Sequence, residues 1–152
     1  MSHAQFNASQ RLMNLVFTSI DYGIEIVRKK DSHLTPALWS EAAGKITNQH
    51  IVAANPVIGV EKAREFVKNL TQETEVYVIL YEGYVTLDAT KYDAIMAEAG
   101  ERGQETALVF AQRYQPKKFL KSFIIIGNVG FFGPAQNLFN YLGQKPPGEI
   151  TM

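Results

Sequence analysis

A few polar residues with catalytic potential stand close to one predicted hairpin of this chain. Glu98 belongs to an otherwise largely apolar strand predicted over residues 92–99. A carboxyl group with apolar neighbours suits acid or base catalysis, because such surroundings favour its neutral form. The sequence therefore admits a small hydrolase-like enzyme that uses Glu98 with Arg113 or Asp93 near the turn at residues 101–104.

The alternative is a structural role for the same carboxylate. Glu98 would then face water at a strand end, or pair with Arg102 or Arg113. A metal site made by Asp93, Glu98 and Glu101 is not expected, because strand alternation places Glu98 on the opposite face from the other two.

A second set of residues suits the recognition of an anion. Arginine binds carboxylate and phosphate groups in a bidentate manner, and nearby amide and ammonium groups add donors. The candidate ligand-binding residues are Arg102, Gln112, Arg113, Lys117 and Lys118. Lys117, Lys118 and Lys121 also admit a third function, an adaptor that binds an acidic partner. The alternative is a solvated turn whose lysine stems cover the edge of the core.

Composition narrows the chemistry further. The chain has no cysteine, which excludes a thiolate nucleophile and a cysteine zinc site. His3, His33 and His50 show no metal-ligand spacing, and the glycines at 127 and 130 lack the lysine of a phosphate loop. We therefore predict no metal and no cofactor, and we favour a protein that is not an enzyme.

Charge and hydropathy bear on partners and location. Lys plus Arg and Asp plus Glu both number 15, so no overall field favours nucleic acid or an anionic membrane. We find neither a signal peptide nor an apolar run long enough to span a bilayer. The sequence predicts a cytoplasmic protein with no nucleic-acid or membrane partner.

The elements that must position these residues follow from hydrophobic periodicity. Apolar residues at three- and four-residue steps predict one helix from Asn7 or Ser9 and another from Pro56 or Ile58 to Leu70. Alternation and turn residues predict strands over residues 33–40, 45–53, 75–81 with 84–87, 92–99, 106–114 and 119–126. Pro36 indicates an edge strand or a bulge, and a chain reversal with a short helix at 136–142 follows the last strand.

This order, α-β-β-α-β-β-β-β, predicts an α+β fold. We expect a mostly antiparallel sheet of about five to six strands with two main helices on one face. At 152 residues the chain is predicted to be a single domain, residues 1–152, with a loose N-terminus at 1–6 and an extended tail at 143–152.

Large apolar side chains remain after the last predicted strand. They would either pack back on the sheet or form a subunit interface, since so much apolar surface is not left in water. The predicted interface residues are Phe131, Phe132, Phe139 and Tyr141. With no net charge to oppose self-association, we predict a homodimer.

Several segments between residues 75 and 130 carry a resemblance to known sequences. The segments are Tyr92-Asp93-Ala94-Ile95, Glu98 to Gly103, Phe110 to Tyr114, Pro116 to Phe119 and Ile126-Gly127-Asn128. In these segments the chain resembles a family of small uncharacterised bacterial proteins with no assigned activity. The resemblance implies a bacterial origin and no residue roles. Our leading hypothesis is a non-enzymatic dimeric module that binds a protein or a small molecule, with the hydrolase as the alternative.

Overall fold

A six-stranded antiparallel sheet forms the centre of the computed structural model, which describes residues 7–140. The strand order is β2-β1-β3-β4-β5-β6. The elements are α1 (Gln10–Val27), β1 (Ala37–Ala42), β2 (Lys45–His50), α2 (Pro56–Lys68), β3 (Thr74–Leu87), β4 (Thr90–Glu101), β5 (Thr106–Gln115) and β6 (Ile124–Gln136). The predicted α+β class and element order are confirmed. The predictions for residues 1–6 and 143–152 lie outside the described residues.

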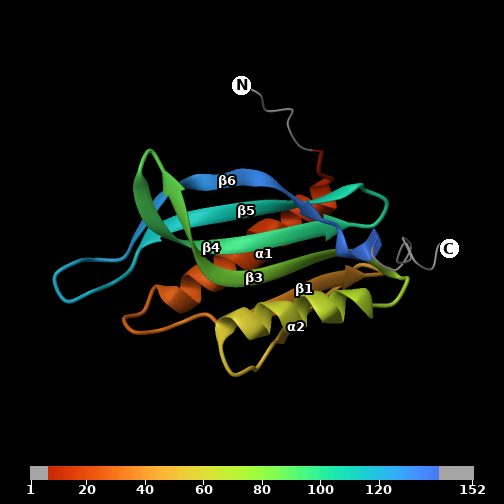
Figure 1. Ribbon diagram of the computed structural model, residues 1–152, viewed down its shortest axis with the longest axis horizontal. Coiled ribbons are helices and arrows are strands. Elements are labelled where there is room, and N and C mark those ends of the chain that lie inside the picture. Colours follow the sequence, from red (N-terminus) through yellow and green to blue (C-terminus); the bar gives the residue numbers. More distant parts are fainter. Residues whose placement is uncertain (1–6, 141–152) are drawn as a thin grey trace.

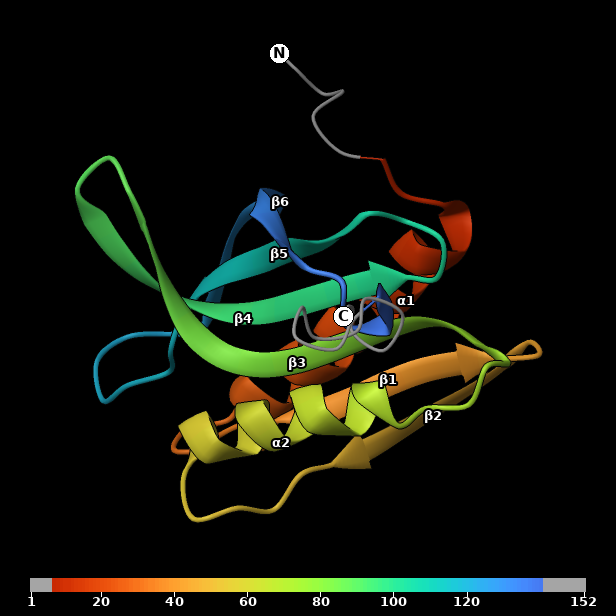
Figure 2. The same cartoon turned by 45° about the vertical axis from the view of Figure 1, so that its right-hand side comes forward.

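The two long helices lie on opposite faces of the sheet, so the prediction that both cover one face is wrong (Figures 1 and 2). Alternate residues of β3 point to different layers. Val78 and Leu80 pack with α1, whereas Tyr77 and Ile79 pack with α2. A strand that is apolar on both faces needs a cover on each, and one helix supplies each cover.

A side chain caps the first turn of each helix: Ser9, one of the two predicted starts, for α1, and Asn55, just before the predicted start Pro56, for α2. Ser9 accepts a hydrogen bond from the Leu12 N–H at 3.0 Å, and Asn55 accepts one from the Ile58 N–H at 2.9 Å. A cap of this kind contributes about 1 kcal/mol, because it satisfies an otherwise free N–H of the first turn. The caps therefore fix where each apolar stripe meets the sheet.

The first strands differ from prediction in position and length. Pro36 precedes β1, which lies inside the sheet between β2 and β3 and has a bulge between Glu41 and Ala42. The predicted interruption at Glu82-Gly83 is absent, since β3 pairs with β4 along its whole length.

The largest error concerns β6. Of the predicted strand 119–126 only residues 124–126 are strand, because residues 116–123 form a loop. The predicted reversal is wrong, since β6 runs through the glycines to Gln136. Its pairing with β5 shifts register twice, and Gly127 and Gly133 have φ values of 71° and 128°. These conformations suit glycine, so the glycines carry the irregular strand past its bulges. Of the predicted helix at 136–142, residues 138–140 are helical and the rest is strand or loop or lies outside the described residues.

Within residues 7–140, neither helix combines the length and the apolar character that crossing a membrane requires.

Candidate functional site

Glu98 is held by α2 instead of by the hairpin residues predicted to act with it. Arg64 donates from Nε to Glu98 Oε1 at 3.2 Å and from Nη2 to Oε2 at 2.7 Å. The Tyr81 hydroxyl donates to the same Oε2 at 2.7 Å. The hydrogen bond to Glu98 raises the pKa of Arg64, and burial together with the Glu98 charge raises the pKa of Tyr81. This arrangement orients a buried carboxylate and occupies both of its oxygens.

The other members of the predicted catalytic set lie elsewhere. Asp93 is on the opposite face of β4 from Glu98, as the alternation of the strand requires. The Arg113 guanidinium lies 4.8 Å from the centre of the Tyr92 ring. The structure therefore does not unite Glu98 with Arg113 or Asp93. Arg64, which the sequence reading missed, stands four residues after Val60 and three before Val67, and this spacing places it beside the buried stripe of α2.

Two predicted ligand-binding residues hold the fold together. Arg102 donates from Nε to the Thr74 carbonyl at 2.8 Å, and its guanidinium lies 4.0 Å from the centre of the Phe139 ring. Gln112 donates from Nε2 to the carbonyl oxygens of Arg113, Ile126 and Gly127 at 3.0 to 3.2 Å. The Arg102 bond therefore holds the start of β3, and the Gln112 bonds hold β5 to β6 where their pairing shifts register.

A continuous series of depressions lies at one end of the sheet. Three cavities of about 310, 290 and 240 Å³ each include His33 in their walls. They extend from Val52 and Pro56 past Glu82 to Lys117 and Lys118. We call this region the loop end and define it as residues 28–36, 51–57, 82–93 and 114–123; its connecting segments gather on the left of Figures 1 and 2.

The centre of the loop end combines a histidine with two carboxylates. Glu82 accepts a hydrogen bond from the Leu34 N–H, and its Oε1 lies 3.4 Å from His33 Nδ1. Asp93 lines two of the same cavities. Burial raises the pKa of Tyr114, and the negative charges of Glu82 and Asp93 raise it further.

The structure thus brings together three of the predicted site residues, Asp93, Lys117 and Lys118. Sequence reasoning missed His33 and Glu82 as their neighbours. The available signal was weak: Glu82 is a charged residue inside an otherwise apolar strand.

The loop end also exposes the least covered apolar side chains. Phe119 and Leu120 are each 85% exposed, Val52 is 82%, Val57 is 74% and Tyr84 is 64% exposed. Every other large apolar side chain of residues 7–140 is less than half exposed. Apolar side chains that gather at one end make that end a candidate contact surface.

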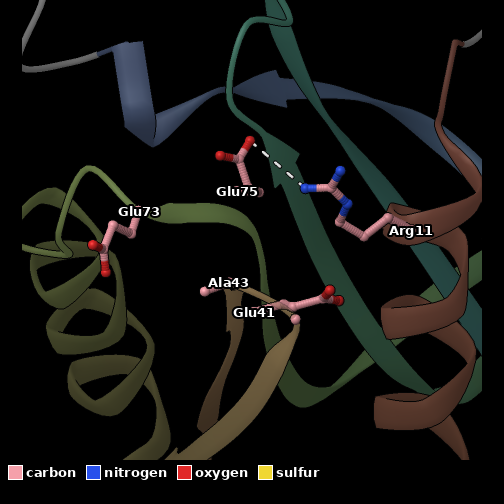
Figure 3. Close-up of a pocket in the computed structure, with 6 residues that line it drawn as sticks. Arg11, Glu41, Ala43, Glu73 and Glu75 are labelled. Atoms are coloured by element: carbon pink, nitrogen blue, oxygen red, sulfur yellow. Dashed lines mark ion pairs between the residues drawn. The ribbon is translucent and has the colours of Figure 1, made fainter.

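The opposite end of the sheet is acidic. An open depression of about 640 Å³ is lined by Glu41, Glu73 and Glu75 together with Arg11 (Figure 3). Arg11 Nη1 lies 3.7 Å from Glu75 Oε1. Among the described residues, no group of three or more histidine or acidic side chains has an arrangement that could hold a metal ion. The chain has no net charge, but this end of the sheet carries an excess of negative groups.

The predicted interface residues have different environments. Phe139 is buried, and its ring centre lies 5.0 Å from that of Tyr77. The ring centres of Phe131 and Phe110 lie 5.7 Å apart. Phe132 is 38% exposed. Tyr141 lies outside the described residues. Phe139 thus packs inside the monomer, while Phe132 retains open surface.

Comparisons of the chain with protein-family models, with curated proteins and with solved structures give no match. The resemblance to a bacterial family stays a prediction, and the function has to be argued from the geometry.

Proposed function

We propose that this chain is a non-enzymatic binding module that contacts its partner through the loop end. The observation that carries the proposal is the concentration there of Phe119, Leu120, Val52, Val57 and Tyr84, the five most exposed large apolar side chains of the described residues. Three lysines stand beside two of them in the sequence, at 117, 118 and 121. Apolar groups beside cations suit a partner that offers apolar surface next to negative charge.

The environment of Glu98 supports a binding role over hydrolysis. A general acid or base must reach substrate, whereas both oxygens of Glu98 accept hydrogen bonds from Arg64 and Tyr81. A hydrolase is the second candidate, and the His33–Glu82 pair favours it. The carboxylate lies beside Nδ1 and leaves Nε2 facing solvent, because the His33 side chain is 81% exposed.

We further propose that the module is a homodimer formed along β6. This strand is an edge of the sheet, and an edge strand offers unpaired N–H and C=O groups to a second chain. Ile124, Ile125 and Phe132 of β6 are 49%, 45% and 38% exposed. Such a contact leaves the loop end free for another partner.

The binding proposal is tested by NMR titration of the ¹⁵N-labelled chain with two anionic probes, hexaglutamate and bicelles that contain phosphatidylserine. We expect at least one probe to shift amide signals of residues 28–36, 51–57 and 114–123 and to leave those of residues 41–45 and 73–75 unchanged. Shifts from neither probe, or shifts centred on the acidic end, would overturn the proposal.

A further inference from the structure

We infer that the loop at residues 116–123 is an insertion element for an anionic lipid bilayer, so that the loop end docks on a membrane surface. The inference rests on the proposed function and names its partner class. It departs from the sequence prediction of no membrane partner, which depended on the absence of a segment able to span a bilayer and on the zero net charge of the chain.

The loop is a small hairpin with an apolar apex. The Lys118 N–H donates to the Lys121 carbonyl at 3.0 Å, and the Lys121 N–H donates to the Lys118 carbonyl at 3.2 Å. Below this pair, Gln115 Nε2 donates to the Ser122 carbonyl at 2.7 Å. The reciprocal bonds leave Phe119 and Leu120 alone at the tip, each 85% exposed.

The order of side chains along the hairpin matches the layers of a membrane interface. Phenylalanine and leucine favour the boundary of the acyl chains, and lysine ammonium groups favour the anionic headgroups just above it. Lys118 and Lys121 flank the apex directly, and Lys117 follows next. Their flexible stems allow each charge to reach a headgroup while the apex enters the apolar layer.

The charges around the hairpin extend this match. Lys29, just after α1, lines the same cavity as Lys117 and Lys118, and the carboxylates at 31, 82 and 93 line it too. The loop end as a whole holds seven lysine and arginine residues against four aspartate and glutamate residues, so it is net positive. The Arg28 guanidinium lies 5.2 Å from the centre of the Phe123 ring, which places a further cation beside the base of the hairpin. The acidic depression lies beside the β1–β2 turn and the start of β3, at the other end of the sheet. A negative surface attracts the basic end and repels the acidic one, so the charge distribution sets the orientation of approach.

A bilayer fits this shape better than a groove on a protein. Val52, on the connection between β2 and α2, and Val57, in the first turn of α2, are 82% and 74% exposed and add a second apolar surface. This connection and the 116–123 loop are separate segments at the same end in both views (Figures 1 and 2). Separate apolar projections can enter a fluid interface together, whereas a protein partner needs a preformed pocket for each of them.

The test is co-sedimentation of the full chain with vesicles at low ionic strength. One set contains phosphatidylcholine alone and the other contains phosphatidylcholine and phosphatidylserine. We expect binding to the anionic set. Phe119→Ser/Leu120→Ser should weaken it at least roughly ten-fold, and Lys118→Gln/Lys121→Gln roughly thirty-fold. The charge-matched control Lys45→Gln/Lys62→Gln, away from the loop end, should bind as the parent does. Phe119→Trp should bind, and its emission should shift to the blue as the new indole enters the apolar layer. The natural Trp39 is only 6% exposed, so it contributes little to this surface signal.

The outcomes separate the two proposals. If the anionic vesicles do not bind the chain, or if the Phe119/Leu120 variant binds unchanged, the lipid inference is wrong. If vesicles fail while hexaglutamate shifts the loop-end signals, the partner is an acidic protein segment and the proposed function stands. If neither probe binds, both proposals fail. The urea midpoint of each variant, compared with the parent, shows that any lost binding is not a loss of folding.

Discussion

Glu98 and Arg64 form a bidentate ion pair where β4 meets α2, with Glu98 buried and the Arg64 side chain 32% exposed. A pair in this position is weak evidence for net stabilisation, because both groups lose water when they come together. Removing one partner is a different matter, since the other charge then stays behind without compensation.

We therefore expect Arg64→Ala to lower the free energy of unfolding by about 2–3 kcal/mol, somewhat less than for a fully buried pair. The measurement is urea denaturation followed by circular dichroism. Glu61→Gln is the matched control, since Glu61 also pairs with Arg64 but is exposed, and its loss should cost less than about 1 kcal/mol. The double variant Arg64→Met/Glu98→Met should recover most of the loss. If Arg64→Ala costs no more than Glu61→Gln, the pair does not hold α2 on the sheet.

Three tyrosines make stability sensitive to alkaline pH. Burial raises the pKa of Tyr77, Tyr81 and Tyr114 above the ordinary phenol value, and nearby carboxylates contribute. The folded state therefore keeps protons that the unfolded state releases above about pH 10. The stabilisation is complete below that pH and is lost as the pH rises through the raised values.

We expect the urea midpoint to stay level up to about pH 9.5 and to fall steadily above about pH 10. Tyr114→Phe removes one of the three titrations and should make this decline shallower. Equal slopes for the parent and Tyr114→Phe would contradict the assignment.

At the residue scale, the sequence identified the correct carboxylate but not its partner. Glu98 stands out because an acid inside an apolar strand requires an explanation. Its partner lies 34 residues earlier in the chain. Local spacing places Arg64 beside the buried face of α2, yet it cannot show which strand that face covers. Similarly, Asp93, Lys117 and Lys118 entered the sequence prediction as members of different candidate sites. The pairing of β4 with β3 and with β5 brings them to one cavity with His33 and Glu82.

Among the elements, β3 and β4 are joined by a close approach of backbone and ring. Gly100 lies opposite Tyr77, and a Cβ added to Gly100 would lie 2.2 Å from the Tyr77 ring. The hydroxyl end of the ring lies against the glycine, and the Tyr77 hydroxyl accepts a hydrogen bond from the Leu138 N–H at 3.1 Å. Gly100 thus lets Tyr77 anchor the segment that follows β6.

Gly100→Ala should displace the Tyr77 ring and lower the free energy of unfolding by about 1–3 kcal/mol. Tyr77→Phe keeps the ring and loses only the hydrogen bond, so it should cost about 1 kcal/mol. Hydrogen exchange at the Leu138 amide should quicken in both variants. The cost of Gly100→Ala should shrink in a Tyr77→Leu background; strict additivity of the two changes would show that ring and glycine are not coupled.

Element prediction succeeded where periodicity and caps were strong and failed where the edges of the sheet were concerned. Ser9 caps α1 and α2 begins at Pro56, each at one of its two predicted starts, and β4 and β5 lie close to their predicted ranges. In β6, glycines at 127, 130 and 133 resemble a chain reversal in the sequence but serve an edge strand that passes two bulges. The placement of the helices on opposite faces depends on which face each apolar stripe meets, and the stripe alone does not specify that.

For the whole molecule, a net charge of zero coexists with positive and negative groups concentrated at different ends of the sheet. Equal numbers of acids and bases led to a prediction of no electrostatic steering, which depends on the average charge. The structure separates the lysines of the loop end from the glutamates around Arg11. Topology creates this separation: the turns that join β1 to β2 and α2 to β3 lie at one end, and the β5–β6 loop lies at the other (Figure 1).

The assembly of two copies can be tested at the same scale. In a β6–β6 contact around a two-fold axis, each copy gives the same residues, so one substitution changes the interface twice. We expect sedimentation equilibrium to show a dimer, and Ile125→Lys to shift it strongly towards monomer, because two buried ammonium groups would meet apolar surface. Ile46→Lys is the matched control: Ile46 is 45% exposed, as Ile125 is, but it lies in β2, the other edge strand of the sheet.

Dissociation by Ile125→Lys and not by Ile46→Lys would place the contact at β6, and the reverse pattern would move it to β2. A parent chain that remains monomeric at about 100 µM, in the micromolar to millimolar range where weak association shows, would remove the dimer from the proposal. The loop-end proposals would survive that result, since the 116–123 hairpin and Val52 lie outside both edge strands. A confirmed dimer would carry two such hairpins, but an antiparallel β6–β6 contact places them at opposite ends of the joined sheet, because each hairpin stands at the start of its β6. One flat bilayer surface then engages only one hairpin of each dimer, and no gain from linked insertions is expected. Loss of the dimer in Ile125→Lys should therefore not weaken vesicle binding, and the blue shift of Phe119→Trp should remain.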